Sequence, residues 1–159
     1  MKGSRIQKGE LSSYTRMKAI LAPIKEIVLQ YNWLLTDCEW VEDSQIWGYE
    51  DGCEWLSGEA FFQDIEKGNS QFFIWGVFSA FDKSITQEEA LSFEKPTIQH
   101  YYGYSKNPVR MQHPLAQIEI LAVDSSFAVF ISKDDAIVDL WSASFPWAED
   151  LETDNRQHQ

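Results

Sequence analysis

Pairs of adjacent carboxylates are the residues of this chain most capable of chemistry. They occur at Glu42-Asp43, Glu50-Asp51, Glu88-Glu89 and Asp134-Asp135. A glycoside hydrolase needs two carboxyl groups about 5–10 Å apart, one of which is withdrawn from water so that it keeps its proton. Because adjacent acids on a polar segment stay solvated, their spacing favours a charged surface over a catalytic pair.

The residues that bind metal ions do not have the spacing of a metal site. Cys38 and Cys53 are the two cysteines, and the histidines are His100, His113 and His158. None of these residues forms a zinc-ligand pattern. Asp51-Gly52 resembles a fragment of a calcium loop, but the alternating oxygen ligands are missing. We therefore predict no metal and no cofactor, and we expect reduced thiols, with a Cys38–Cys53 disulfide as the alternative.

Motifs of phosphate-binding loops, nucleophile elbows and zinc proteases are also absent from the sequence. The chain is therefore predicted not to be an enzyme. Two alternatives stay open. One is a protein that binds or hydrolyses a small molecule or sugar with carboxylates from distant segments. The other is a ligand-binding or structural module in which the tyrosine-rich loop 100–106 closes over a cavity.

Residues 26–66 contain eleven acidic residues and no lysine or arginine, together with Trp33, Trp40, Trp47 and Trp55. Acidic residues accelerate encounters with a basic partner, and exposed indoles supply the strongest contacts of an interface. The residues predicted to bind the partner are Asp37, Glu39, Trp40, Glu42, Asp43, Trp47, Tyr49, Glu50, Asp51 and Glu54, and Asp134-Asp135 could extend this surface. The competing interpretation buries the indoles in the core and leaves the acids as a solvated rim.

The net charge of −12 opposes binding to nucleic acid or to an anionic membrane. The segment His100–Lys106 with Arg110 is the one aromatic and basic stretch, and it reads more readily as an edge strand or loop packed on the core. No run of 18 apolar residues and no signal peptide is present, so we expect a cytoplasmic protein without a membrane partner.

Several short segments resemble a family of small bacterial single-domain proteins of unassigned function. They are Tyr31-Asn32-Trp33-Leu34, residues 72–78, Val123-Asp124-Ser125 and Ser132-Lys133-Asp134. This resemblance implies no catalytic residue. In size, acidity and lack of catalytic motifs, the chain also resembles immunity proteins, which are cytoplasmic antidotes that neutralise a toxin. The second resemblance implies a protein that occludes a basic, nuclease-like toxin domain.

The elements that must position these residues are mixed helices and strands. The predicted helices run from Ser12 or Ser13 to about Leu21, and over 24–30, 58–67 and about 87–93, with a final helix after Ser132 whose inward stripe is Ile137, Leu140 and Trp141. The predicted strands are 31–40 and 71–81, followed by a hairpin over 115–132. The echo of Cys38-Glu39-Trp40 in Cys53-Glu54-Trp55 could mark the two arms of another hairpin.

This order of elements predicts one α+β domain over residues 1–159, with a mostly antiparallel sheet and helices packed mainly on one face. The first residues are rich in lysine and arginine. Residues 1–11 are therefore expected either as a flexible basic arm or as an arm docked on the protein's own acids. Residues 149–159 are expected to be a frayed polar tail.

Overall fold

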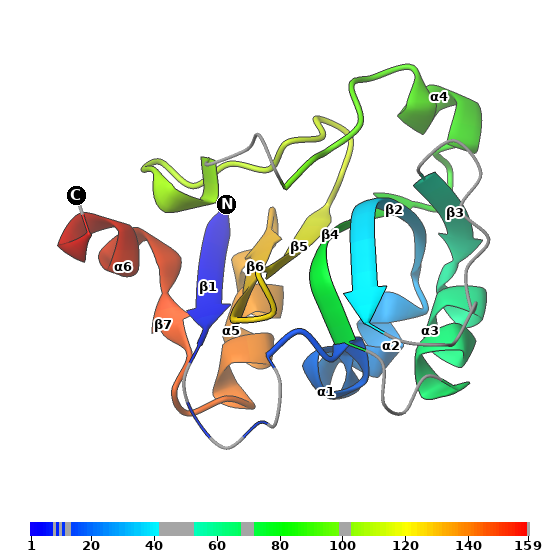
Figure 1. Ribbon diagram of the computed structural model, residues 1–159. Coiled ribbons are helices and arrows are strands. Elements are labelled where there is room, and N and C mark those ends of the chain that lie inside the picture. The colour runs from blue at the N-terminus through cyan, green and yellow to red at the C-terminus, as the bar shows by residue number, and fades with distance from the viewer. Residues whose placement is uncertain are drawn as a thin grey trace.

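The computed structural model describes residues 1–7, 9, 11, 14–41, 53–67, 72–98 and 103–158, without the side chains at 40, 41 and 72. Its centre is a seven-stranded sheet in the order β3-β2-β4-β5-β6-β1-β7 (Figure 1). The strands are β1 (Lys2–Ile6), β2 (Tyr31–Val41), β3 (Cys53–Ser57), β4 (Phe72–Asp82), β5 (Ile118–Val123), β6 (Phe127–Ser132) and β7 (Glu149–Asp150). Every neighbouring pair is antiparallel, which confirms the predicted α+β class.

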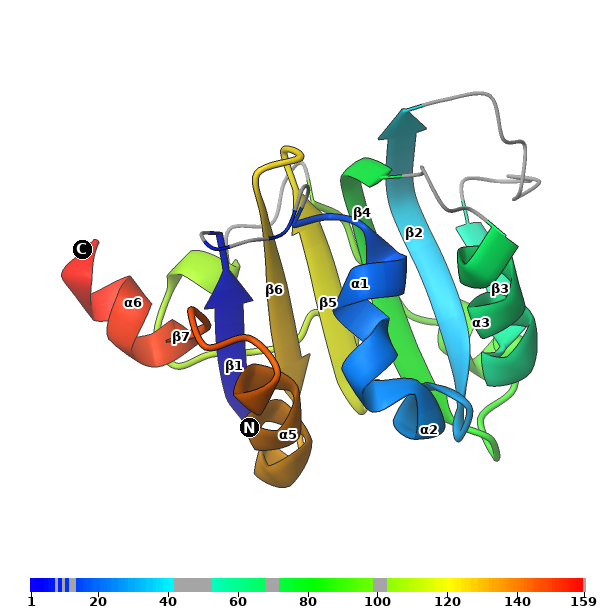
Figure 2. The same cartoon turned by 90° about the horizontal axis from the view of Figure 1, so that it is seen from below.

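One face of the sheet carries most of the helices (Figure 2). They are α1 (Met17–Leu21), the 3-10 turn η1 (Ala22–Ile24), α2 (Lys25–Val28), α3 (Gly58–Lys67) and α5 (Asp135–Ala143). Large aromatic side chains fill the space between these helices and the strands. The rings of Trp33 and Phe61 lie 4.9 Å apart, and those of Phe130 and Trp141 stack at 5.0 Å. Because alternate residues of a strand point to opposite faces, this core uses only one side of each strand.

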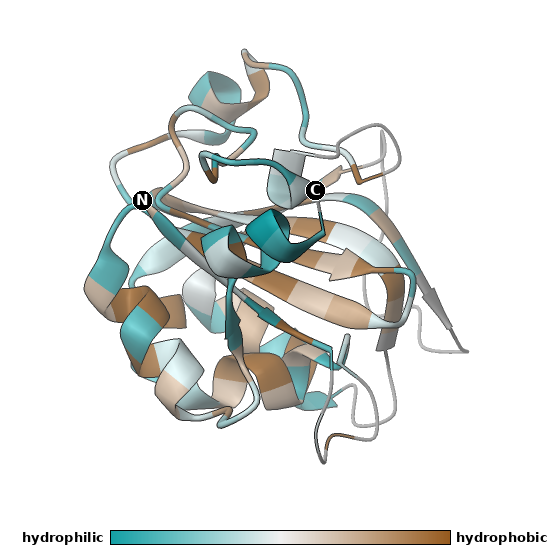
Figure 3. Cartoon of the chain, turned by 90° about the vertical axis from the view of Figure 1, so that its left-hand side faces the viewer, coloured by the Kyte–Doolittle hydropathy of each residue, from teal (hydrophilic) through white to brown (hydrophobic). Residues whose placement is uncertain are grey.

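The opposite face buries a second set of apolar side chains, among them Val77, Leu121, Val129 and Leu151. Its cover consists of irregular chain with α4 (Gln87–Leu91), the 3-10 turn η2 (Gly103–Ser105) and α6 (Leu151–Gln157). The hydropathy colouring shows that α6 is largely hydrophilic while the strands behind it are hydrophobic (Figure 3). The sheet is therefore covered on both faces, by different kinds of structure.

Local signals explain several helix boundaries. The Ser57 hydroxyl accepts a hydrogen bond from the Ala60 amide at 3.1 Å and caps α3, as predicted. A β-carbon at Gly58 would lie 2.3 Å from the Val28 carbonyl oxygen, so the start of α3 requires glycine. The capping box of Thr86 and Glu89 at the start of α4 is also confirmed.

The N-terminal segment follows the second of its two predicted alternatives, the docked arm, and not the flexible one. Lys2–Ile6 is not a flexible arm, because it forms β1 and pairs with β6 and β7. The terminal amino group of Met1 lies 3.4 Å from an Asp135 oxygen, and Lys2 bonds to Asp139. The basic arm is thus docked on the protein's own acids. Its pairing depends on residues more than 120 positions away, which short-range sequence patterns do not report.

The expectation of a frayed tail is wrong for Glu149–Gln157, which forms β7 and α6. The Asp150 carboxylate caps α6 by accepting from the Thr153 amide at 2.9 Å, and Leu151 is fully buried. In α5 the predicted stripe is wrong at Leu140, whose side chain is 50% exposed. The cap of α5 is Asp134, and Val138 and Trp141 are its buried residues.

Candidate functional site

The described part of the predicted binding segment belongs to β2 and β3. Thr36 of β2 pairs with Cys53 of β3, so the echoed Cys-Glu-Trp motifs do belong to two arms of a hairpin. Of the predicted residues, the structure describes the side chains of Asp37, Glu39 and Glu54. The side chain of Trp40 lies outside the described part of the chain. So do the other predicted residues, which are Glu42, Asp43, Trp47, Tyr49, Glu50 and Asp51.

Asp37 has a structural role in the fold. Its φ angle of 47° places it in the left-handed region, within an irregular stretch of the β2–β4 pairing. Its carboxylate accepts a hydrogen bond from the Ile98 amide at 2.7 Å. Asp37 therefore fixes a distant segment to β2, whereas Glu39, two residues further on, is exposed and available to a partner.

Glu54 is partly withdrawn from water. Burial, reinforced by the negative charge of Asp64, raises the pKa of its carboxyl to about 7. One of its oxygens is buried and has no hydrogen-bond partner within the described residues. Near neutral pH, Glu54 therefore presents only part of a negative charge to a partner.

The indoles of the acidic segment do not all face outward. Trp33 is fully buried, and its Nε1–H donates to the Val28 carbonyl oxygen at 3.0 Å. Trp55 is half-buried, with its ring centre 5.4 Å from that of Phe81. The expectation of outward indoles is wrong for Trp33, which is a core residue. For Trp40 and Trp47 it stays a prediction.

A second group of exposed acids, which we call the α4 corner, consists of Asp82, Glu88, Glu89 and Glu94, and the exposed Lys83 and Lys95 lie in the same segment. Phe93 lies among them and is 41% exposed. Hydrogen bonds from Ser84 lower the pKa of Asp82, and hydrogen bonds from Thr86 lower that of Glu89, so both stay ionised. Sequence reasoning identified the Glu88-Glu89 pair, but it did not identify this corner as a surface.

Asp134 and Asp135 are engaged with their own chain. The Asp134 carboxylate accepts from the Ala136 amide at 3.0 Å as the cap of α5. Asp135 faces the terminal amino group. Both residues were predicted to extend the binding surface. In the structure, both carboxylates already contact groups of the protein itself.

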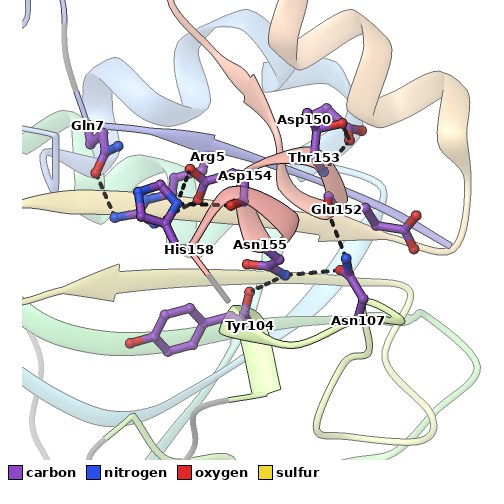
Figure 4. Close-up of polar contacts among 10 residues, drawn as sticks. All are labelled: Arg5, Gln7, Tyr104, Asn107, Asp150, Glu152, Thr153, Asp154, Asn155 and His158. Carbon is purple, nitrogen blue, oxygen red and sulfur yellow. Dashed lines mark hydrogen bonds and ion pairs between the residues drawn. The ribbon is translucent and has the colours of Figure 1, made fainter.

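A polar network joins α6 to β1 (Figure 4). The Arg5 guanidinium donates to the buried Asp154 carboxylate at 2.8 Å and lies 4.0 Å above the Phe127 ring. His158 lies 3.4 Å from the other Asp154 oxygen, but its side chain is 67% exposed. Because Arg5 already neutralises Asp154, this arrangement anchors α6 and does not form an acid–base pair for catalysis.

Among the described acids, Glu119, the second residue of β5, is the most deeply buried. Burial raises the pKa of its carboxyl to about 7, against the opposing effect of hydrogen bonds from Gln112 and His113. Burial also lowers the pKa of His113. The sequence identified His113 only as a histidine outside any metal-binding pattern. The one sequence signal for the burial of Glu119 was its position as a single acid in an apolar strand.

Three pockets lined by described residues have volumes of about 280–360 Å³. Neither Glu54 nor Glu119, the acids with strongly raised pKa, lines any of them. Within the described ranges, no three metal-binding side chains come together, and no helix is long and apolar enough to cross a membrane.

No protein-family model matches the chain, nor does any curated protein or solved structure.

Proposed function

We propose that the protein is a cytoplasmic immunity protein that binds a basic, nuclease-like toxin domain and occludes it. The observation that carries the proposal is the segment 26–66, with eleven acids and no base, in a chain of net charge −12. A nuclease lines its active site with lysine and arginine to hold phosphate. An acidic surface attracts such a site and competes with the nucleic acid for it.

The internal ion pairs support a surplus of negative charge at the surface. Lys2, Arg5, Lys18, Lys67 and Lys83 each lie within ion-pair distance of one of the protein's own carboxylates. Within the part of the chain that the structure describes, Glu39, Glu88 and Glu94 belong to none of these pairs. These three exposed acids therefore remain available for cations of a partner.

The alternative, an enzyme acting on a small molecule or sugar, requires a pocket that holds two carboxyl groups, one with a raised pKa. Glu54 beside Asp64 has the electrostatics of such a pair. Glu54 lines none of the three pockets formed by described residues at 22–27, 149–157 and 103–110, so none of these three supports the alternative.

The proposal is tested by inhibition. The protein is mixed with the purified basic domain encoded by a toxin-like reading frame next to its own, and nucleic-acid cleavage is measured. We expect cleavage to stop at one molecule of the protein per molecule of toxin. An unrelated protein of similar negative charge is the control for non-specific inhibition by a polyanion. Unchanged cleavage at stoichiometric amounts, or equal inhibition by the control, would contradict the proposal.

A further inference from the structure

The strand β3 is one of the two outermost strands of the sheet (Figure 1). Within the part of the chain that the structure describes, its paired neighbour is β2 alone. Its side chains are half-buried from Cys53 to Leu56, and Ser57 is exposed. An edge strand keeps a row of backbone N–H and C=O groups that a further strand can bind. The sheet can therefore be extended at β3.

The hydrogen bonds of β4 show which residues of β3 point their backbone groups outward. The Ala80 carbonyl oxygen accepts from the Gln117 amide on the β5 side, so the neighbouring Ser79 directs its backbone groups to β2. Ser79 pairs with Leu34 of β2, and Leu34 therefore bonds to β4 and not to β3. The residue of β3 opposite Leu34 is Trp55. Trp55 consequently points its N–H and C=O away from β2.

Backbone directions alternate along a strand, so Cys53 and Ser57 point outward together with Trp55, whereas Glu54 and Leu56 bond to β2. In an added strand, the residue opposite Glu54 would then belong to a pair without direct hydrogen bonds. Side chains approach each other most closely in such pairs. The side chain placed beside Glu54 therefore decides which strands fit this edge.

The Glu54 carboxyl favours a cation at that place. Glu54 and Leu56 are on the face of the sheet that α3 covers, where Asp64 of α3 adds a second negative charge. Lys67 lies 3.8 Å from an Asp64 oxygen, but one Glu54 oxygen is buried without a hydrogen-bond partner among the described residues. An apolar neighbour would withdraw this carboxyl further from water without compensation. A lysine or arginine would supply both a donor and a counter-charge.

We propose that β3 binds an extended segment of the basic partner as an additional strand, with a lysine or arginine of that segment beside Glu54. The inference rests on the proposed function, because the partner supplies the segment. The outward backbone groups of Cys53, Trp55 and Ser57 bond to the segment whatever its sequence. Main-chain bonds thus provide affinity, and Glu54 selects for positive charge.

A second copy of the chain is a poor occupant of this edge. Each copy has a net charge of −12, which repels another copy. Antiparallel pairing of two β3 strands centred on Glu54 would place two carboxyl groups side by side. Centring the pairing on Trp55 would place Glu54 opposite Leu56, again without a cation. A basic segment avoids both arrangements.

A short synthetic peptide of alternating lysine and threonine tests this inference without the toxin domain. Amide hydrogen exchange is followed by NMR at Cys53, Trp55 and Ser57. These amides should exchange rapidly in the free protein, and at least about tenfold more slowly with saturating peptide. A peptide of alternating glutamate and threonine is the control, and it should leave their exchange unchanged.

Two variants separate the backbone from the side-chain contribution. Cys53→Pro removes an outward N–H without removing a bond to β2, and proline is tolerated at such positions of edge strands. We expect it to bind the lysine peptide about fivefold more weakly than Cys53→Ala, which loses the same side chain but keeps the N–H. Glu54→Gln, which preserves the shape of the side chain, should weaken binding at least about threefold. If Cys53→Pro does not fold, Glu54→Gln decides.

Three results would overturn the inference. Slow exchange of these amides in dilute free protein would mean that the chain itself covers the edge. Protection that appears only as the protein concentration rises would assign the edge to a second copy. Equal effects of the two peptides, or no effect of either, would remove the selection for positive charge. The proposed function is judged separately, because a toxin domain that is inhibited while the Trp55 amide stays unprotected would overturn this inference alone.

Discussion

At the scale of single residues, the acids of this chain have three different roles. Asp37 and Asp134 accept backbone hydrogen bonds and fix the fold. Glu54 and Glu119 are withdrawn from water, so their ionisation opposes folding. Glu39 and the acids of the α4 corner are exposed. A single sequence does not separate these roles, because the distinction depends on which amides and apolar groups the fold brings to each carboxyl.

Glu54 supplies the first prediction. Its pKa is about 7 in the folded state and 4.5 when solvated, so the stability linked to its proton is present below pH 4.5 and lost as the pH rises through 7. We expect Glu54→Gln to raise the free energy of unfolding by roughly 1 kcal/mol at pH 8, after a discount for its partial solvation. The gain should disappear at pH 4. Urea unfolding at both pH values measures it.

The matched control is Glu39→Gln, which removes an exposed acid from the neighbouring strand. This change should leave the free energy of unfolding within about 0.5 kcal/mol of the original at either pH. Equal changes in the free energy of unfolding for the two substitutions would show that burial of Glu54 does not cause the gain in stability.

At the scale of elements, hydrophobic periodicity and capping residues predicted the helices and hairpins whose formation depends on neighbouring residues. Ser57 and Gly58 mark the start of α3, and the alternating apolar residues of Ile118–Ser132 mark the β5–β6 hairpin. The strand β1 escaped prediction because Lys2–Ile6 contains two bases and a glycine and becomes a strand only by pairing with β6. The irregular segment 103–117 and its hydrogen bonds to Glu119 escaped prediction for the same reason.

The capping box of α4 allows a local test. Thr86→Ala removes the side chain that accepts from the Glu89 amide at 3.2 Å, and we expect it to lower the free energy of unfolding by about 1 kcal/mol. Ser92→Ala, at the other end of the same helix, is the comparison. Its hydroxyl donates to the Glu89 carbonyl oxygen, which the helix end leaves accessible to water, so a smaller loss is expected. Thermal or urea unfolding would distinguish the two.

The anchoring of α6 to β1 allows a stronger test. In Asp154→Asn, the Arg5 guanidinium would stay largely buried without its counter-charge, and we expect a loss of about 3 kcal/mol in the free energy of unfolding. Glu152→Gln changes an acid of the same helix whose backbone, but not its carboxylate, is bonded to Asn107. This control should cost less than about 0.5 kcal/mol. A similar small loss for Asp154→Asn would mean that Arg5 is solvated.

At the scale of the whole molecule, the sequence predicts the net charge but only part of its distribution over the surface. The excess of acids over bases is evident from composition, and so is the acidic stretch at 26–66. The docking of the basic N-terminus on Asp135 and Asp139, and the exposure of Phe93 in the α4 corner, follow from tertiary contacts. Among the described residues, the exposed acids near the predicted binding segment include Glu39, and those of the α4 corner form a separate group.

The proposed function requires that the acids between Asp37 and Glu54 bind a basic partner. The most direct test measures the dissociation constant for the toxin domain after Glu39, Asp43, Glu50 and Asp51 are changed to lysine, beside a variant with Glu88 and Glu94 changed to lysine. We predict at least about a hundredfold weaker binding for the hairpin variant, loss of most of its salt dependence, and nearly unchanged binding for the α4 variant. Affinity and salt dependence that survive the hairpin reversal would contradict the claim.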